Sequence, residues 1–278
     1  MTRARGFSLV ELAVVMAIVA FLLGGLMYTL SAQVEQRNFE DTRRRLEQAR
    51  ELVLSFAIVK GRLPCPARSN SAGMEVRVAD TDAVVADRGK CQDAGGVVDY
   101  YGGAPGGAVG GLLPAATIGY QQVDSAGFAI DAWSNRLRYV VANMVTNCSG
   151  IPTTPHFTNS TNLRANGITC QPNDLIVCRS ATGIVANDCG PAANQIMTTS
   201  LVVVIIYSTG KNFASAQTAA IAAAAGRIDE AANLNGDRVF VFHTPNPGGA
   251  ANGEFDDQFT WITVGELYGK LIAAGALP

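Results

Sequence analysis

The chain has 278 residues and a formal net charge of −2, so its length suits one large domain or two small ones. Nucleic-acid-binding proteins usually carry a basic excess, and this near-neutral balance excludes that footprint. The strongest asymmetry is in hydropathy, because an apolar segment close to the N-terminus precedes a more polar, glycine-rich remainder.

Residues 7–30 contain a single charged residue, Glu11. About 20 apolar residues are enough to span a bilayer as a helix, so this segment predicts a transmembrane helix. Arg3 and Arg5 precede the segment and favour a cytoplasmic N-terminus, with the rest of the chain outside. A secretory signal peptide is the alternative, but its small-residue cleavage site has only a weak candidate, around Ser31.

Helical character continues beyond the apolar segment. Apolar residues recur at steps of three, four or seven up to Phe56, with one looser step after Val34, and no proline occurs before Pro64. This spacing places one apolar stripe on an amphipathic helix. We therefore predict one continuous helix over 7–60, apolar all round in its first half and on one side in its second.

The start of this helix carries a recognisable motif. A short basic leader ends in "RG" and is followed by "FSLVELAVVMAIVAFL", with a glutamate at the fifth position after the glycine. This motif resembles the N-terminus of type IV pilins and pseudopilins. In that family a prepilin peptidase cleaves after the glycine and methylates the new amino terminus. The resemblance implies a leader over 1–6 that ends at Gly6, an N-methylated Phe7, and Glu11 as the family's acidic residue.

The resemblance also suggests why a carboxylate interrupts an apolar segment. A carboxylate inside an apolar helix bundle needs a cationic partner. Cleavage creates an ammonium group at Phe7, and the ammonium of a neighbouring subunit can pair with Glu11 when two helices dock at the right stagger. Glu11 is therefore a predicted assembly residue. The alternative is a polar residue near the membrane edge that reaches lipid headgroups.

Residues 61–278 form the predicted globular head. Segments rich in β-branched and aromatic residues predict strands around 137–141 and at 175–178, 200–208, 237–243 and 259–264. Thr263 and Glu266 form a capping-box pattern that starts a short C-terminal helix. The expected fold is α+β and pilin-like, with a long N-terminal helix packed on an antiparallel β-sheet.

One short stretch of the head has a second resemblance. Asp131, Trp133, Asn135 and Tyr139 loosely match the D-x-W-G-x-x-Y-x-Y stretch of pseudopilins, and Ser134 stands where the glycine is usual. We interpret Asp131 and Trp133 as parts of a structural turn.

All six cysteines follow the apolar segment. If the head is periplasmic, an even number indicates three disulfides. The sequence does not choose among the many pairings; sequential pairing is our preference, which joins Cys65 with Cys91, Cys148 with Cys170, and Cys178 with Cys189.

Cofactor and enzyme motifs are not found in the sequence. Neither a nucleotide-binding loop nor a hydrolase or metalloprotease motif occurs, so we expect no cofactor and no enzymatic activity. Glu254, Asp256 and Asp257 are oxygen donors that could bind calcium, as some major pseudopilins do near the C-terminus. A solvated acidic loop is the preferred interpretation of these three residues.

The resemblance implies a structural subunit of a type IV pilus or a type II secretion pseudopilus. Its partners would be prepilin peptidase, other pilin or pseudopilin subunits and the inner-membrane assembly platform. It would cross the bacterial inner membrane once, place its head in the periplasm, and then enter the filament. A mature length of 272 residues (278 minus 6) favours a minor subunit. The alternative function is a helix-anchored surface protein whose head binds a ligand.

Overall fold

The computed structural model describes residues 8–93, 95–101, 111–144, 155–215 and 218–277, without the side chains of 23–31 and 214–215. The predicted processing residues Gly6 and Phe7 and the predicted disulfide cysteine Cys148 lie outside this set. The chain divides into two compact units, Met1–Asp41 and Thr42–Pro278, and each is described by itself.

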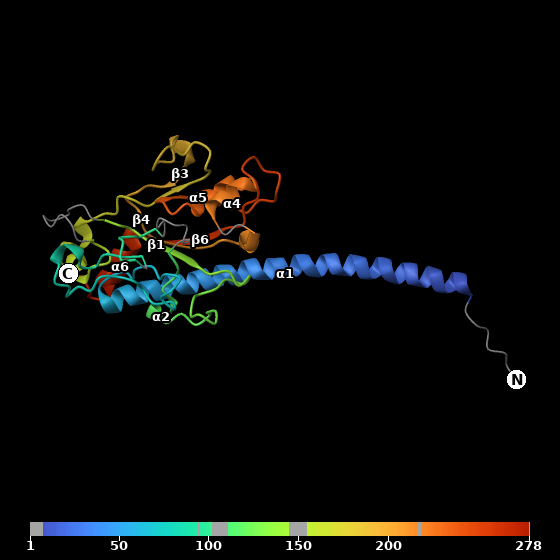
Figure 1. The fold of residues 1–278 in the computed structure, drawn as a ribbon, viewed down its shortest axis with the longest axis horizontal. Helices are drawn as coiled ribbons and strands as arrows, with labels where there is room; N and C mark the ends of the chain where they lie inside the picture. Colours follow the sequence, from blue (N-terminus) through green and yellow to red (C-terminus); the bar gives the residue numbers. More distant parts are fainter. Residues whose placement is uncertain (1–7, 94, 102–110, 145–154, 216–217, 278) are drawn as a thin grey trace. The chain divides into compact units, whose positions relative to one another are not determined.

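The first unit is helical. Helix α1 runs without interruption over Leu9–Lys60 and extends into the second unit (Figure 1). Its described apolar side chains before residue 23 are exposed, with Leu9 and Phe21 each 85% exposed. Across the part of the chain whose placement is described, no helix combines the length and apolar character needed to cross a membrane.

The second unit is built on the last turns of α1. The face of the helix that the periodicity predicted is buried in the main core, and its members are Leu46, Ala49, Val53, Leu54, Phe56 and Ala57. The opposite face of these turns carries exposed residues such as Glu51 and Ser55. Burial of this stripe joins the helix to the sheet residues of the same core.

The main sheet has strand order β1-β4-β6, and both pairs are antiparallel. Its strands are β1 (Arg138–Val141), β4 (Val202–Ser208) and β6 (Gln258–Thr263). Every residue of the central strand β4 is buried. Tyr207 on β4 faces Phe259 on β6, and their rings stack with centroids 4.9 Å apart. The predicted α+β fold with an antiparallel sheet is confirmed here.

The head also contains a second, smaller sheet that was not predicted and that is mixed. Its order is β3-β2-β5, with β3 (Gln195–Met197), β2 (Ile176–Cys178) and β5 (Val239–Val241). Strand β2 pairs antiparallel with β3 but parallel with β5. A parallel pair needs a long crossover, and the chain between β2 and β5 includes β3, β4 and two helices. The head sheets are therefore not purely antiparallel.

The remaining helices are short. Their bounds are α2 (Ala115–Ile118), α3 (Ser160–Asn166), α4 (Ala219–Ala224), α5 (Ile228–Asn233) and α6 (Val264–Ala273), with 3-10 turns at Val85–Asp87, Gly167–Thr169, Ala192–Asn194 and Lys211–Ser215.

Helix α6 is the predicted C-terminal helix. The Thr263 side chain accepts a hydrogen bond from the Glu266 backbone N–H, as the capping-box pattern predicts. The Glu266 carboxylate forms an ion pair with Arg50 of α1 instead of completing the box. This ion pair ties the C-terminal helix to the part of α1 in the same unit.

Two disulfides lie within the described residues. Cys65 pairs with Cys91, and Cys178 pairs with Cys189, with Cα–Cα distances of 5.3 and 5.4 Å. These are two of the pairs that sequential pairing assigns. Cys170 is also disulfide-bonded. Its predicted partner, Cys148, lies outside the described residues.

The turn before β1 is organised by Asp131, which is 1% exposed. One carboxylate oxygen accepts hydrogen bonds from the Trp133 and Asn135 backbone N–H groups, each at 2.8 Å. The other accepts a hydrogen bond from the Ser208 hydroxyl at 2.6 Å. Ser134 sits in this turn with φ 69°, a left-handed conformation that favours glycine. This conformation gives a physical reason for the glycine that the related motif has there.

We expect Ser134→Gly to stabilise the head. The Ser134 side chain is exposed, so the substitution mainly removes the steric cost of a Cβ at positive φ. The free energy of unfolding should rise by about 0.5–1 kcal/mol. Urea denaturation of the full-length chain in detergent measures this change. Ser134→Ala keeps the Cβ and is the matched control; equal stabilities of the Gly and Ala variants would contradict the explanation.

Candidate functional site

The N-terminus of α1 is closed by a reciprocal pair of hydrogen bonds. The Ser8 backbone N–H donates to Glu11 Oε2 at 2.8 Å, and the Glu11 backbone N–H donates to Ser8 Oγ at 3.2 Å. This is a capping box, in which the serine and the glutamate satisfy two free N–H groups of the first turn. Ser8 and Glu11 form the S-x-x-E pattern that predicts such a box, although the sequence prediction above did not include it.

The capping box orients the predicted assembly residue. Glu11 Oε2 accepts a hydrogen bond from the Ser8 backbone N–H, while Oε1 makes no hydrogen bond among the described residues. The carboxylate therefore lies at the exposed beginning of the helix with one oxygen available to a cation. The partial positive charge of a helix N-terminus also stabilises a negative charge at this position.

A second group of functional side chains lies in the head. Carboxylate oxygens of Glu230, Asp256 and Asp257 all lie within 4.8 Å of one another, and all three residues are buried. We call these three residues the acidic cluster. Glu230 comes from α5, and the two aspartates precede β6. Glu230 is separated from the aspartates by 26 residues or more, so no local sequence pattern identifies this group.

Backbone and amide donors position the acidic cluster. The Asp256 backbone N–H and Asn212 Nδ2 donate to Glu230 Oε1 at 3.0 and 2.9 Å. Asn233 Nδ2 donates to Asp257 Oδ2 at 2.8 Å. Gly210 has φ 66°, and a Cβ at this position would collide with the Asp256 carboxylate. Only glycine therefore lets this carboxylate lie where it does.

Burial and mutual repulsion raise the pKa values of the acidic cluster. Desolvation, followed by the charges of Glu230 and Glu254, raises the pKa of Asp256 to about 7. Desolvation also raises the pKa of Asp257 well above its usual range, and the pKa of Glu230 is raised for the same reason. Arg227 offsets part of this repulsion, since its Nε lies 3.6 Å from Glu230 Oε2.

The cluster differs from the three residues that the sequence suggested for calcium. Asp256 and Asp257 lie together, but the third member is Glu230, while Glu254 lies 3.8 Å from Lys211 Nζ. Hard oxygen ligands at this spacing suit a divalent cation such as Ca²⁺. Asp256 Oδ1 is buried and has no hydrogen-bond partner among the described residues. The acidic cluster could thus hold either protons or a cation.

We expect the stability of the head to fall as pH rises from about 4 to 7 in the presence of a chelator. An unfolded aspartate titrates near 3.8, whereas Asp256 in the folded chain titrates near 7. The folded state thus binds a proton that the unfolded state releases, and this linkage lowers the free energy of unfolding with rising pH. The loss should be on the order of 2–4 kcal/mol.

Urea denaturation at several pH values measures this loss. Asp256→Asn should make the profile shallower, because it removes one of the carboxyl groups with a raised pKa, whereas Asp188→Asn, at an exposed site, should leave it unchanged. Repeating the series with calcium chloride tests the cation: a stabilisation of the wild-type chain at pH 8 that Asp256→Asn lacks would assign calcium to the cluster. A flat wild-type profile in chelator would contradict the proton-holding account.

The two histidines do not form a hydrolytic site. His243 Nε2 lies 3.1 Å from Asp229 Oδ2, and Ser180 Oγ lies 3.4 Å from Asp229 Oδ1. The carboxylate stands between serine and histidine, whereas a serine hydrolase needs the histidine in the middle. His156 is buried beside Tyr268, and desolvation lowers its pKa to about 4. The contacts of both histidines therefore indicate structural roles.

Comparison with known proteins identifies the N-terminal segment. Residues 1–27 match the family model described as the prokaryotic N-terminal methylation motif. No curated protein and no solved structure matches the chain. The match covers the first 27 of 278 residues and includes Gly6, Phe7 and Glu11.

The match supports a type IV pilin-like or pseudopilin-like prepilin. It implies processing by prepilin peptidase and assembly with pilin-like subunits. It also favours a structural role over an enzymatic one. The head, which begins after α1, has no counterpart in these comparisons.

Proposed function

We propose that this chain is a minor structural subunit of a type IV pilus or a type II secretion pseudopilus. Prepilin peptidase cleaves it between Gly6 and Phe7 and methylates Phe7, and the subunit assembles through α1. The observation that carries the proposal is the methylation motif over residues 1–27, whose apolar part begins an unbroken helix of 52 residues, Leu9–Lys60.

The first unit supports this proposal through its surface. The described apolar side chains of α1 from Leu9 to Leu22 are exposed in the single chain. Large exposed apolar surfaces indicate an interaction with another protein or with a membrane. Residues 7–30 would lie in the inner membrane before assembly and against neighbouring helices in the filament. The inner-membrane assembly platform would move the subunit between these two environments.

The second unit supports a periplasmic head over residues 61–278. Disulfides persist in oxidising compartments such as the periplasm and are rare in the cytosol. The bridges of Cys65 with Cys91 and of Cys178 with Cys189 fit that compartment. The leader, residues 1–6, would remain in the cytoplasm after cleavage.

Mass spectrometry of the mature N-terminus tests the processing. Protein purified from cells that express prepilin peptidase should begin at Phe7 with a methylated amine. Gly6→Leu should leave the full precursor in the membrane, because the peptidase cleaves after a glycine. A mature chain that begins near Ala32, or an uncleaved wild-type chain, would overturn the proposal.

We expect Glu11→Ala to be processed and anchored normally but to enter filaments poorly. Removing one partner of a charge pair inside a helix bundle leaves the other charge unpaired. Incorporation should fall by about tenfold or more. Quantitative immunoblots of membrane and filament fractions, normalised to a major subunit, measure this ratio.

Two further variants separate charge from helix capping. Glu11→Gln keeps a side-chain oxygen that can accept the Ser8 N–H but loses the negative charge, so it should assemble as poorly as Glu11→Ala. Ser8→Ala removes the hydroxyl cap and keeps the charge, so it should assemble far better than either. Normal assembly of Glu11→Gln would show that the charge of Glu11 is not the assembly contact.

A further inference from the structure

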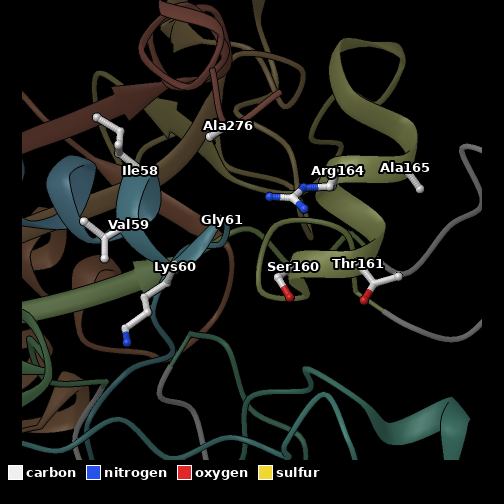
Figure 2. A pocket seen from close by; sticks show the side chains of 9 residues that line it. All are labelled: Ile58, Val59, Lys60, Gly61, Ser160, Thr161, Arg164, Ala165 and Ala276. Atoms are coloured by element: carbon white, nitrogen blue, oxygen red, sulfur yellow. The ribbon is translucent and has the colours of Figure 1, made fainter. Parts of the chain in front are cut away.

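A pocket of about 580 Å³ lies in the second unit, between the C-terminal turn of α1 and helix α3 (Figure 2). Its lining combines three segments that are far apart in the sequence: the end of α1 from Ile58 to Gly61, helix α3, and the C-terminal tail at Ala276. Pockets of about 300–1,000 Å³ are typical of small-ligand sites.

The lining of this pocket has an aliphatic part and a cationic part. One part of its lining is aliphatic and comes from Ile58, Val59, Ala165 and Ala276. The other part offers two cationic side chains, Lys60 and Arg164, and two hydroxyls. A mixed lining of this kind suits a ligand with a charged end and a short apolar tail.

Two cationic side chains of the pocket are unpaired among the residues that the structure describes. Neither Lys60 nor Arg164 makes a hydrogen bond or ion pair with another residue that the structure describes. Four other arginines of the same unit, by contrast, are paired with carboxylates, namely Arg62, Arg68, Arg77 and Arg136. In Figure 2 the guanidinium of Arg164 extends from α3 toward Gly61, across the opening between the two helices.

The neighbouring polar groups leave the pocket positively charged. Ser160 Oγ donates to Asp80 Oδ2 at 2.9 Å, and the same aspartate pairs with Arg77. Asp80 is therefore compensated by its own arginine and does not neutralise Arg164. The Thr161 hydroxyl makes no hydrogen bond among the described residues and can donate to a ligand.

We propose that this pocket binds a small organic anion, with a carboxylate or phosphate group held by Arg164 and a short aliphatic tail against Ile58 and Ala165. Arginine suits this task because its planar fork of N–H donors matches both headgroups. The Thr161 hydroxyl adds a donor, and Lys60 adds positive charge at the rim. This binding role goes beyond filament assembly and would give the head a ligand of its own.

A structural role for Arg164 is the competing explanation. Cations near the C-terminal end of a helix offset the partial negative charge of its free carbonyl groups. Arg164 points toward that end of α1 and could act in this way alone. In that case its removal would change the stability of the head without changing the binding of any anion.

Equilibrium dialysis with radiolabelled hexanoate tests the proposal. The full-length chain is placed in nanodiscs of zwitterionic lipid, and empty nanodiscs give the background. Unlabelled hexanoate, hexyl phosphate, hexanamide and inorganic phosphate then compete with the label. Hexanoate should bind saturably, with Kd on the order of 1 mM. Hexanamide lacks the charge and should compete about tenfold more weakly, and inorganic phosphate, which lacks the tail, should also compete weakly.

Variants locate the binding. Arg164→Gln should weaken hexanoate binding about tenfold. Arg179→Gln removes the same charge from another exposed arginine, which follows β2, and should leave hexanoate binding unchanged. Ala165→Asp keeps Arg164 but places a carboxylate in the lining, so it should abolish hexanoate binding. This second variant tests the site even if Arg164→Gln lowers the stability of the head. Absence of saturable binding, equal competition by hexanamide, or unchanged binding in Ala165→Asp would overturn the proposal.

Discussion

The head depends on the burial of one face of α1. Ala49, Val53 and Ala57 recur every four residues and are completely buried, so they form a narrow stripe that the core can approach closely. Arg50, on a neighbouring face, donates to the Trp261 carbonyl at 3.1 Å and pairs with Glu266. Apolar packing and these polar contacts together attach β6 and α6 to the helix. Without this stripe, the buried face of the main sheet would be left in water.

The start of the same helix shows how one carboxylate can serve two states of the chain. In the single chain Glu11 completes a capping box with Ser8, which lowers the cost of beginning a helix at an exposed end. Only one of its oxygens is used, so a cation from a neighbouring subunit could bind the other without breaking the cap. Such an arrangement would hold the carboxylate in place before assembly and reduce the entropy lost on pairing.

The sequence predicted local elements better than long-range contacts. The helix and the strands of the main sheet follow from periodicity and from β-branched composition, and the Asp131 turn follows from its polar residues. The parallel pairing of β2 with β5 was not predictable, because strand orientation depends on the path of the chain between them. The proximity of Glu230 and Asp256 was not predictable for the same reason, because their two segments are separated in sequence and meet only in the folded head.

The head contains more chemistry than filament assembly requires. Assembly through α1 requires a helix and a soluble domain that does not obstruct packing. These requirements do not explain buried carboxylates or unpaired cations in a pocket. Buried carboxylates with raised pKa values destabilise a fold at neutral pH unless protons or a cation neutralise them. The acidic cluster lies between α5 and the start of β6, while the pocket lies between α1 and α3. Because these features use different elements, the acidic cluster can respond to pH or a cation, and the pocket can be tested for anion binding, each without altering the other.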